Sequence, residues 1–170
     1  PALLVDLPGL QDIGRQLATL EYEAITTVYA AFDAGTRLPA AMTGFVAGEP
    51  HWVFDRGQLG GPPGLLASVV SAASGTRDET ERAVLATLRS QFPSLPDPLW
   101  VRTISERRAT FRCTPGRAAI EQPRDTRIAI AGDYLIADYP ATLEAAVRSG
   151  LAAASRLAGA SCKTQDSSGK

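Results

Sequence analysis

A glycine and an aspartate close an apolar run near the C-terminal end of the sequence. Residues 127–131 read Arg-Ile-Ala-Ile-Ala, which predicts a short buried strand, and Gly132 and Asp133 follow it. After a short loop, Pro140 marks the start of a helix, because proline is favoured in the first helical turn. A strand that leads into a helix N-terminus presents free backbone N–H groups and the positive end of the helix dipole. These residues therefore suit an anionic or strongly hydrogen-bond-accepting ligand.

The helix that follows, predicted from Ala141 to about Ala158, carries many small residues, which let a helix come close to a sheet or to a flat ligand. They are Ala145, Ala146, Gly150, Ala152, Ala153 and Ala154. A separate stripe is expected to face the core, made of Leu143, Val147, Leu151 and Ala158. Glu144 and Arg148 are expected to form an exposed ion pair four residues apart. A strand, loop and helix without any ligand would show the same pattern, so this unit alone leaves both interpretations open.

Longer strings around this unit carry more information. Three of them resemble the C-terminal FAD-binding signature of flavin-containing amine oxidases and desaturases: Ala131-Gly132-Asp133-Tyr134, Tyr139-Pro140-Ala141-Thr142-Leu143-Glu144 and Ala146-Val147-Arg148-Ser149-Gly150. They are most similar to the squalene-associated FAD-dependent desaturases, also called hydroxysqualene dehydroxylases. Further strings resemble the same family in the same order, at residues 20–23, 52–57, 106–111 and 114–116. The resemblance therefore covers roughly residues 8–158.

The resemblance implies FAD as the cofactor and assigns its contacts to named positions. These are Gly132, Asp133, Tyr134, Pro140, Ala141, Thr142 and Leu143. Gly132 would permit close approach of the backbone, and the Asp133 carboxylate would accept hydrogen bonds from the ribityl hydroxyls. The N–H groups at the start of the helix would meet the pyrimidine edge of the flavin, where the helix dipole stabilises negative charge on the reduced ring. The resemblance assigns no catalytic residue.

An activity for the full-length protein is also implied. It would be an FAD-dependent oxidoreductase of isoprenoid and hopanoid precursor metabolism that converts hydroxysqualene to squalene by reductive dehydroxylation. Two other enzymes remain open: a carotenoid-type desaturase that runs in the opposite redox direction, and an amine oxidase relative. A non-catalytic fragment that associates with itself or with its missing half is an alternative from another class.

An apolar isoprenoid substrate would need an apolar wall. Trp52 and Phe54 are candidates for it, although large aromatic side chains in strands belong more often to the core. His51, the only histidine, is expected at a strand edge or on the surface. The arginines at positions 102, 107, 108, 112 and 117 are expected to form a solvated face.

The glycine-rich loop of a dinucleotide site has no counterpart in the sequence. No Gly-x-Gly-x-x-Gly string occurs, and the densest glycine stretch, residues 57–64, is interrupted by Pro62 and Pro63. The chain opens on Pro1 and an apolar run rather than on methionine. We therefore expect the adenine-side half of the FAD site to lie upstream, in a missing N-terminal half that would be a partner of this chain.

The remaining pattern predicts an α+β chain with a mixed set of helices and strands. A helix is predicted after the Pro8-Gly9 turn, from the stripe Leu10, Ile13, Leu17 and Leu20. Another is predicted from the capping-box spacing of Thr76 and Glu79 as far as Pro93. Strands are predicted near residues 24–32, 42–46, 51–55, 65–72 and 99–104. The tight turns imply antiparallel neighbours, and the first strand is expected to be covered on both faces.

These elements predict the C-terminal part of a two-domain FAD-dependent oxidoreductase. Residues 1–112 would belong to a substrate domain with an antiparallel or mixed sheet. Residues 113–158 would supply the last strand and helix of the FAD-binding domain, and residues 159–170 would form a flexible tail.

Composition excludes several classes of function. With 45% hydrophobic residues, 21% charged residues and a net charge of −1, the chain has no basic field for nucleic acid. Cys113 and Cys162 lie too far apart for a C-x-x-C unit, so no metal site is predicted and a reducing cytoplasm is expected. No apolar run spans the roughly 18–20 residues of a transmembrane helix. Peripheral contact with the inner face of the membrane and formation of a homo-oligomer stay open.

Overall fold

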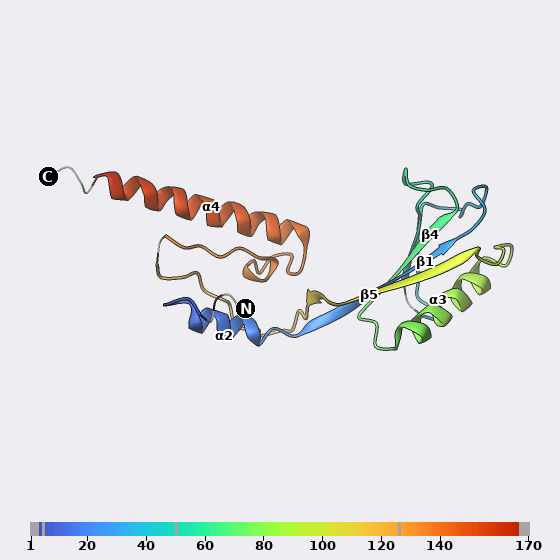
Figure 1. The fold of residues 1–170 in the computed structure, drawn as a ribbon, viewed down its shortest axis with the longest axis horizontal. Coiled ribbons are helices and arrows are strands. Elements are labelled where there is room, and N and C mark those ends of the chain that lie inside the picture. The colour runs from blue at the N-terminus through green and yellow to red at the C-terminus, as the bar shows by residue number, and fades with distance from the viewer. Residues whose placement is uncertain (1–3, 5, 50, 126, 167–170) are drawn as a thin grey trace. The chain divides into compact units, whose positions relative to one another are not determined.

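The computed structural model of the chain describes residues 4, 6–49, 51–125 and 127–166, with side chains as far as residue 159. The chain forms two compact units. We call residues 22–110 the sheet unit, and residues 1–21 together with 111–170 the terminal unit. The mixed α+β class predicted from the sequence is confirmed (Figure 1).

A five-stranded sheet with the order β2-β3-β4-β1-β5 forms the sheet unit. Its strands are β1 (Tyr22–Ala31), β2 (Met42–Phe45), β3 (His51–Asp55), β4 (Leu65–Ser71) and β5 (Trp100–Phe111). The pairs β1–β4, β2–β3 and β3–β4 are antiparallel. For the consecutive strands β2, β3 and β4, this is the pairing that the tight turns predicted. β5 continues past Ile104, the predicted end, because an edge strand accommodates the charged residues that follow.

Helix α3 (Arg77–Gln91) covers one face of this sheet. Its predicted capping box is confirmed: the Glu79 amide donates to Thr76 Oγ1 at 3.2 Å, and the Thr76 amide donates to Glu79 Oε2 at 2.8 Å. The core of the unit lies between helix and sheet, and its aliphatic members are Val28, Ala30, Leu38, Val53, Leu66, Val70, Val84 and Leu88. Each larger side chain among them contributes about 1.5–3 kcal/mol by burial.

The other side of the sheet, which carries Trp52, Phe54 and Val69, is the open face. β1 shows the contrast between the two sides, since Val28 and Ala30 are 1% exposed while Tyr29 is only half-buried. The expectation that this strand is covered on both faces is therefore wrong for the described residues. A helix packs on one side only, so the strand alternates instead of being buried throughout.

Helix α2 (Gln11–Ala18) anchors the N-terminal residues in the terminal unit. Leu10, Ile13 and Leu17 are buried in a cluster with Ile130, which confirms the predicted apolar stripe. This packing corrects the predicted boundary, because the first 21 residues cluster with the C-terminal segment and not with the sheet.

Residues 127–131 form no strand, contrary to the prediction. A strand requires a neighbouring strand for its backbone groups, and here a side chain takes that place. The Ile130 amide donates to Gln122 Oε1 at 3.0 Å, and Gln122 Nε2 donates to the Ile130 carbonyl at 2.8 Å. One glutamine amide thus satisfies both backbone groups of Ile130 and leaves the segment extended but irregular.

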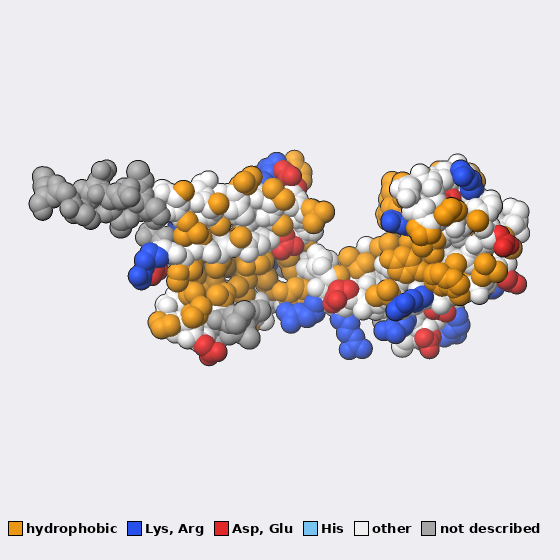
Figure 2. All heavy atoms as spheres, turned by 45° about the horizontal axis from the view of Figure 1, so that its top comes forward, with side chains coloured by type: hydrophobic (Ala, Val, Ile, Leu, Met, Phe, Trp, Pro, Cys, Tyr) orange, Lys and Arg blue, Asp and Glu red, His pale blue; other side chains and the backbone are white. Residues whose placement is uncertain are grey.

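Helix α4 (Leu143–Asp166) faces the interior with the side opposite to the one predicted. Ala145, Ser149 and Ala153 are buried, whereas the expected core stripe is exposed: Leu143 by 88%, Val147 by 58% and Leu151 by 65%. The small residues let the helix backbone come close to the irregular segment, which leucine side chains on that side would prevent. Figure 2 shows hydrophobic side chains on the outer surface of this helix.

Both ends of α4 also differ from those predicted. It begins at Leu143 and not at Ala141, and it continues through residues 159–166, which were expected to form a flexible tail. Alanine, lysine and glutamine in that stretch favour a helix, and no proline stops it. Residues 167–170 of the expected tail lie outside the described residues. In the part of the chain that the structure describes, no helix has the length and apolar character required to span a bilayer.

Candidate functional site

The loop between the irregular segment and α4 contains the residues assigned to the cofactor except Leu143, which is the first residue of α4. Gly132 is extended, with φ of 169°, and the short 3-10 helix η1 (Asp133–Leu135) follows it directly. The loop then reaches Thr142, which precedes the first residue of α4. η1 packs against α4, so the two helical elements hold this loop between them.

Gly132 is required by its neighbours. A Cβ atom at this position would lie 2.2 Å from Cε1 of Tyr134, so the tyrosine ring occupies the space that a side chain would need. The Gly132 amide donates to Ser149 Oγ at 2.8 Å. Ser149 is buried on the small-residue side of α4 and was not predicted as a site residue. Its signal in the sequence is its position in the four-residue spacing Ala145, Ser149, Ala153, where it is the one polar member.

Arg117 fixes the carbonyl side of η1. Its Nη2 donates to the Tyr134 carbonyl at 2.8 Å, and its guanidinium carbon lies 5.0 Å from the centroid of the Phe111 ring. The sequence placed Arg117 on a solvated face, but it is partly buried because these two contacts draw it against the unit. Arg102, Arg107, Arg108 and Arg112 are exposed as expected.

The Asp133 carboxylate has no hydrogen-bond or ion-pair partner among the described residues. It belongs to the first residue of η1 and is partly buried. A carboxylate with open acceptor positions can receive hydrogen bonds from hydroxyl groups, and bonds to a charged acceptor are worth about 1.5–3 kcal/mol.

The start of α4 offers backbone donors. Thr142 caps the helix, because its Oγ1 accepts from the Ala145 amide at 3.2 Å. Ala141 precedes the cap with φ of 59°, in the left-handed region, and Tyr139 has φ of 57°. Such conformations cost a non-glycine residue roughly 1–2 kcal/mol each, and they turn the loop sharply into the helix. The amides of the first helical residues point out of the helix end, where its dipole is positive.

Trp52 and Phe54 lie on the open face of the sheet unit, whereas the loop residues belong to the terminal unit. The more frequent alternative, a core position, is wrong for Trp52, which is 50% exposed; Phe54 is half-buried. A depression of about 470 Å³ lies beside Trp52. Figure 2 shows hydrophobic side chains gathered on the surface of this unit.

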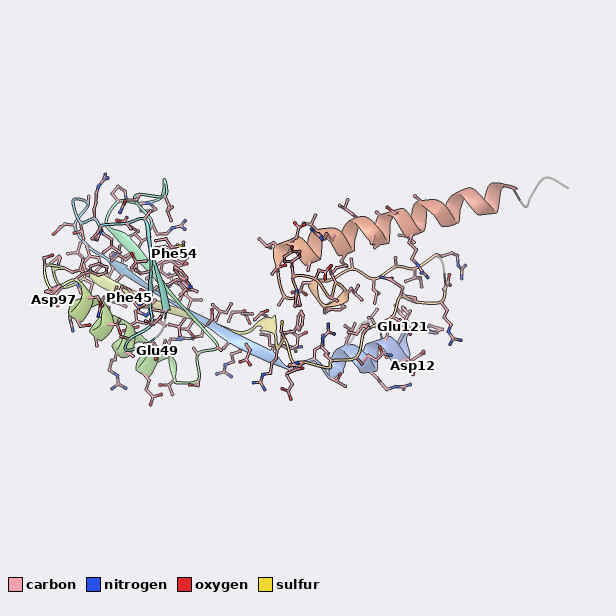
Figure 3. All side chains as sticks on the ribbon, turned by 180° about the vertical axis from the view of Figure 1, so that it is seen from behind. Asp12, Phe45, Glu49, Phe54, Asp97 and Glu121 are labelled. Atoms are coloured by element: carbon pink, nitrogen blue, oxygen red, sulfur yellow. The ribbon has the colours of Figure 1, made fainter. Side chains whose placement is uncertain are left out.

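His51 is buried and not at a surface, which corrects the prediction. It lies on β3, inside the sheet, and is 4% exposed because Phe45 packs against its ring at 5.0 Å between centroids. Burial lowers the pKa of His51, and the nearby Glu49 opposes that shift only in part. Its Nδ1 donates to the Glu49 carbonyl at 2.6 Å (Figure 3 labels Phe45 and Glu49). The neutral imidazole is therefore a structural element of the hairpin.

A second depression, of about 660 Å³, lies in the terminal unit between α2 and the irregular segment. Asp12 and Glu121, both labelled in Figure 3, contribute to its lining. Asp12 forms an ion pair with Arg15, and Arg124 and Asp125 also line the depression. Among the described residues no group of three or more His, Cys, Asp or Glu side chains could hold a metal ion.

Comparison with known proteins decides the family. The model of the family described as "Flavin containing amine oxidoreductase" matches residues 7–158. The chain belongs to this family. It is also 29% identical over 156 residues to hydroxysqualene dehydroxylase of Rhodopseudomonas palustris (strain ATCC BAA-98 / CGA009). That similarity covers 87% of this chain and 34% of the relative, so the chain spans about a third of the relative's length.

The chemistry of the loop residues can be compared with that of a flavin nucleotide, the cofactor class of this family. The unpartnered Asp133 carboxylate suits sugar-like hydroxyls, and the positive end of α4 suits an electron-rich ring edge. Gly132 fits less directly, because Ser149 already accepts from its amide and the Tyr134 ring covers its α-carbon. The site residues that remain available are thus Asp133 and the first amides of α4.

Proposed function

We propose that the intact protein is an FAD-dependent oxidoreductase that removes the hydroxyl of hydroxysqualene reductively to give squalene. The observation that carries this proposal is the similarity to hydroxysqualene dehydroxylase over 87% of the chain. The free Asp133 carboxylate beside the start of α4, within the signature shared with flavoenzymes, supports FAD as the flavin.

The residues of the loop would bind and orient the cofactor. Asp133 would accept from ribityl hydroxyls, and the amides of the first turn of α4 would face the pyrimidine edge of the ring. Tyr134, Pro140, Ala141 and Thr142 would shape the turn that brings these two elements together. A bound flavin supplies the two electrons of such a reaction, in which a C–H bond replaces the C–O bond and the hydroxyl leaves as water. Trp52 and Phe54 would form part of an apolar wall that excludes water from the substrate.

The cofactor assignment is tested by replacing Asp133 in the intact protein. Losing a hydrogen bond to a charged acceptor costs about 1.5–3 kcal/mol, so Asp133→Ala should weaken FAD binding roughly tenfold to a hundredfold. Asp138→Ala is the matched control, because Asp138 is an exposed aspartate of the same loop. Affinity is measured by titrating the apoprotein with FAD and following flavin fluorescence.

An unchanged FAD affinity in a folded Asp133→Ala variant would remove Asp133 from the site. A fall in thermal stability of the apoprotein with little change in FAD affinity would instead assign Asp133 a purely structural role in η1.

The reaction is tested by incubating the reduced flavoprotein with hydroxysqualene and identifying the product by mass spectrometry. Squalene is the expected product. Introduction of double bonds into a polyene precursor, or oxidation of an amine, would replace the proposal with a desaturase or an amine oxidase. An intact protein that binds no flavin and elutes as a self-associated species would support the non-catalytic alternative.

A further inference from the structure

We infer that the depression beside Trp52 binds a neutral hydrocarbon chain, and that Gly44 sets its width by giving room to the Trp52 ring. The inference deepens the proposed function, on which it rests for the nature of the hydrocarbon, an isoprenoid. Gly44 lines the depression and also positions the Trp52 ring, and Trp52 is expected to touch the ligand.

The relation between Gly44 and Trp52 follows from the register of the sheet. Gly44 on β2 and Trp52 on β3 are direct cross-strand partners, and Val69 on β4 is the partner of Trp52 on the other side. A Cβ atom on Gly44 would lie 3.0, 3.1 and 3.2 Å from three carbon atoms of the Trp52 ring. The ring therefore rests against the backbone of Gly44, on the β2 side of its own strand. This leaves space on the open face beside Val69.

That space has the size and chemistry of a site for an apolar ligand. Its volume of about 470 Å³ falls within the usual range of roughly 300–1,000 Å³ for small-molecule sites. No charged residue lines it, and Ser71 supplies the one polar side chain on its open-face wall, because the His51 ring is buried on the other side of the sheet. Trp52 and Val46, two of its apolar walls, are 50% and 94% exposed. Because apolar walls without charge favour an uncharged apolar occupant, a hydrocarbon chain fits better than an anionic ligand.

A side chain at position 44 would narrow the depression, because Gly44 lines it together with Trp52. Contacts of 3.0–3.2 Å are too close for carbon atoms, so the Trp52 ring would have to move away from Gly44. Val69 lies on the opposite side, so the ring would move over the floor of the depression and narrow it. Alanine is also favoured over glycine within a strand, so the substitution does not weaken β2 by itself.

The test uses an intact flavoprotein in which every tryptophan other than Trp52, Trp100 among them, is replaced by phenylalanine. Farnesol, a neutral isoprenoid alcohol, is the probe, and Trp52 emission is the measured signal. We expect a saturable shift of the emission to shorter wavelength as farnesol covers the ring. Gly44→Ala should weaken farnesol binding about tenfold or more, equivalent to about 1.4 kcal/mol. Gly35→Ala is the matched control, since a Cβ there meets nothing within 4 Å, and it should bind farnesol like the background.

Val69→Phe fills the same depression from its floor and serves as the test variant if Gly44→Ala fails to fold. It should also weaken farnesol binding about tenfold. The inference is overturned if Trp52 emission does not respond to farnesol, or if the folded Gly44→Ala and Val69→Phe variants bind it as tightly as Gly35→Ala. Tighter binding of farnesyl diphosphate than of farnesol would overturn the assignment to a neutral ligand.

Failure of this inference differs from failure of the proposed function. A flavoprotein that yields squalene, but whose Trp52 emission does not respond to farnesol, contradicts only the site beside Trp52. A protein whose Trp52 responds to farnesol, but which neither binds FAD nor converts hydroxysqualene, contradicts only the proposed function.

Discussion

Asp55→Asn should destabilise the sheet unit by about 2–4 kcal/mol at neutral pH. Asp55 ends β3 and is 1% exposed. Its Oδ2 accepts from the Leu38 amide at 2.9 Å and from Gln58 Nε2 at 2.8 Å, and its Oδ1 accepts from the Gln58 amide at 3.2 Å. Asparagine keeps the shape but must turn its NH2 group toward at least one of these donors. One buried donor without an acceptor costs about 1–3 kcal/mol, and the other bonds lose the strength that the charge provides.

The same variant tests how the free energy of unfolding depends on pH. Burial raises the pKa of Asp55, but hydrogen bonds from Gln58, Leu38 and Gly57 outweigh that effect and hold the pKa below its usual range. The pKa of Asp55 is lower in the folded protein than in the unfolded chain, where it is about 3.9. The carboxylate therefore stabilises the fold at pH values above the pKa of the unfolded chain, and this stabilisation is lost as the pH falls through the pKa of the folded protein. The difference between wild type and Asp55→Asn should therefore shrink below about pH 4.

Urea unfolding of the intact protein, followed by tryptophan emission at several pH values, measures both effects. Asp97→Asn is the control, because Asp97 is 86% exposed in its pair with Arg89 and such pairs contribute about 0–1 kcal/mol. The reasoning is refuted if Asp55→Asn is as stable as Asp97→Asn at pH 7, or if the difference between them persists unchanged at pH 3.

Two further substitutions, one in each unit, test the backbone conformation at a glycine. Gly64→Ala should lower the free energy of unfolding by more than about 2 kcal/mol, because φ is 70° there and a Cβ would lie 2.5 Å from the Asp33 carbonyl oxygen. Thermal unfolding measures this effect, and an unchanged melting temperature would contradict it. Gly150→Ala should raise the free energy of unfolding by about 0.8–1 kcal/mol, because a Cβ there meets nothing within 4 Å and alanine favours a helix. A lower free energy of unfolding, measured with denaturant, would show that another surface packs against this side of α4.

Local signals in the sequence predicted the elements that depend on local contacts. The capping box at Thr76 and Glu79 satisfies backbone groups within four residues, so no distant partner is needed for it to form. α2 was predicted equally well, since its stripe of Leu10, Ile13 and Leu17 is the buried side of a short helix. The antiparallel pairing of the consecutive strands β2, β3 and β4 followed from the turns between them.

The predictions that were wrong required knowledge of which neighbour a segment meets. The spacing of Leu143, Val147 and Leu151 shows that these residues share one side of α4, but spacing alone does not tell which side is buried. Residues 127–131 have the composition of a strand, yet a strand forms only beside another strand, and Gln122 satisfies Ile130 instead. In the candidate site, Asp133 and the start of α4 were predicted, whereas the roles of Ser149 and Arg117 depend on tertiary contacts.

Both errors concern apolar surface in the terminal unit, and they have one physical explanation. A leucine and valine stripe that is 58–88% exposed gains free energy when another apolar surface covers it. A strand-like segment likewise gains when a neighbouring strand pairs with it. The chain spans about a third of the relative that it matches, and we propose that the remaining length of an intact protein supplies both partners. The sequence pattern would then describe the terminal unit within the intact protein, while the structure describes how these residues satisfy their backbone groups without those partners.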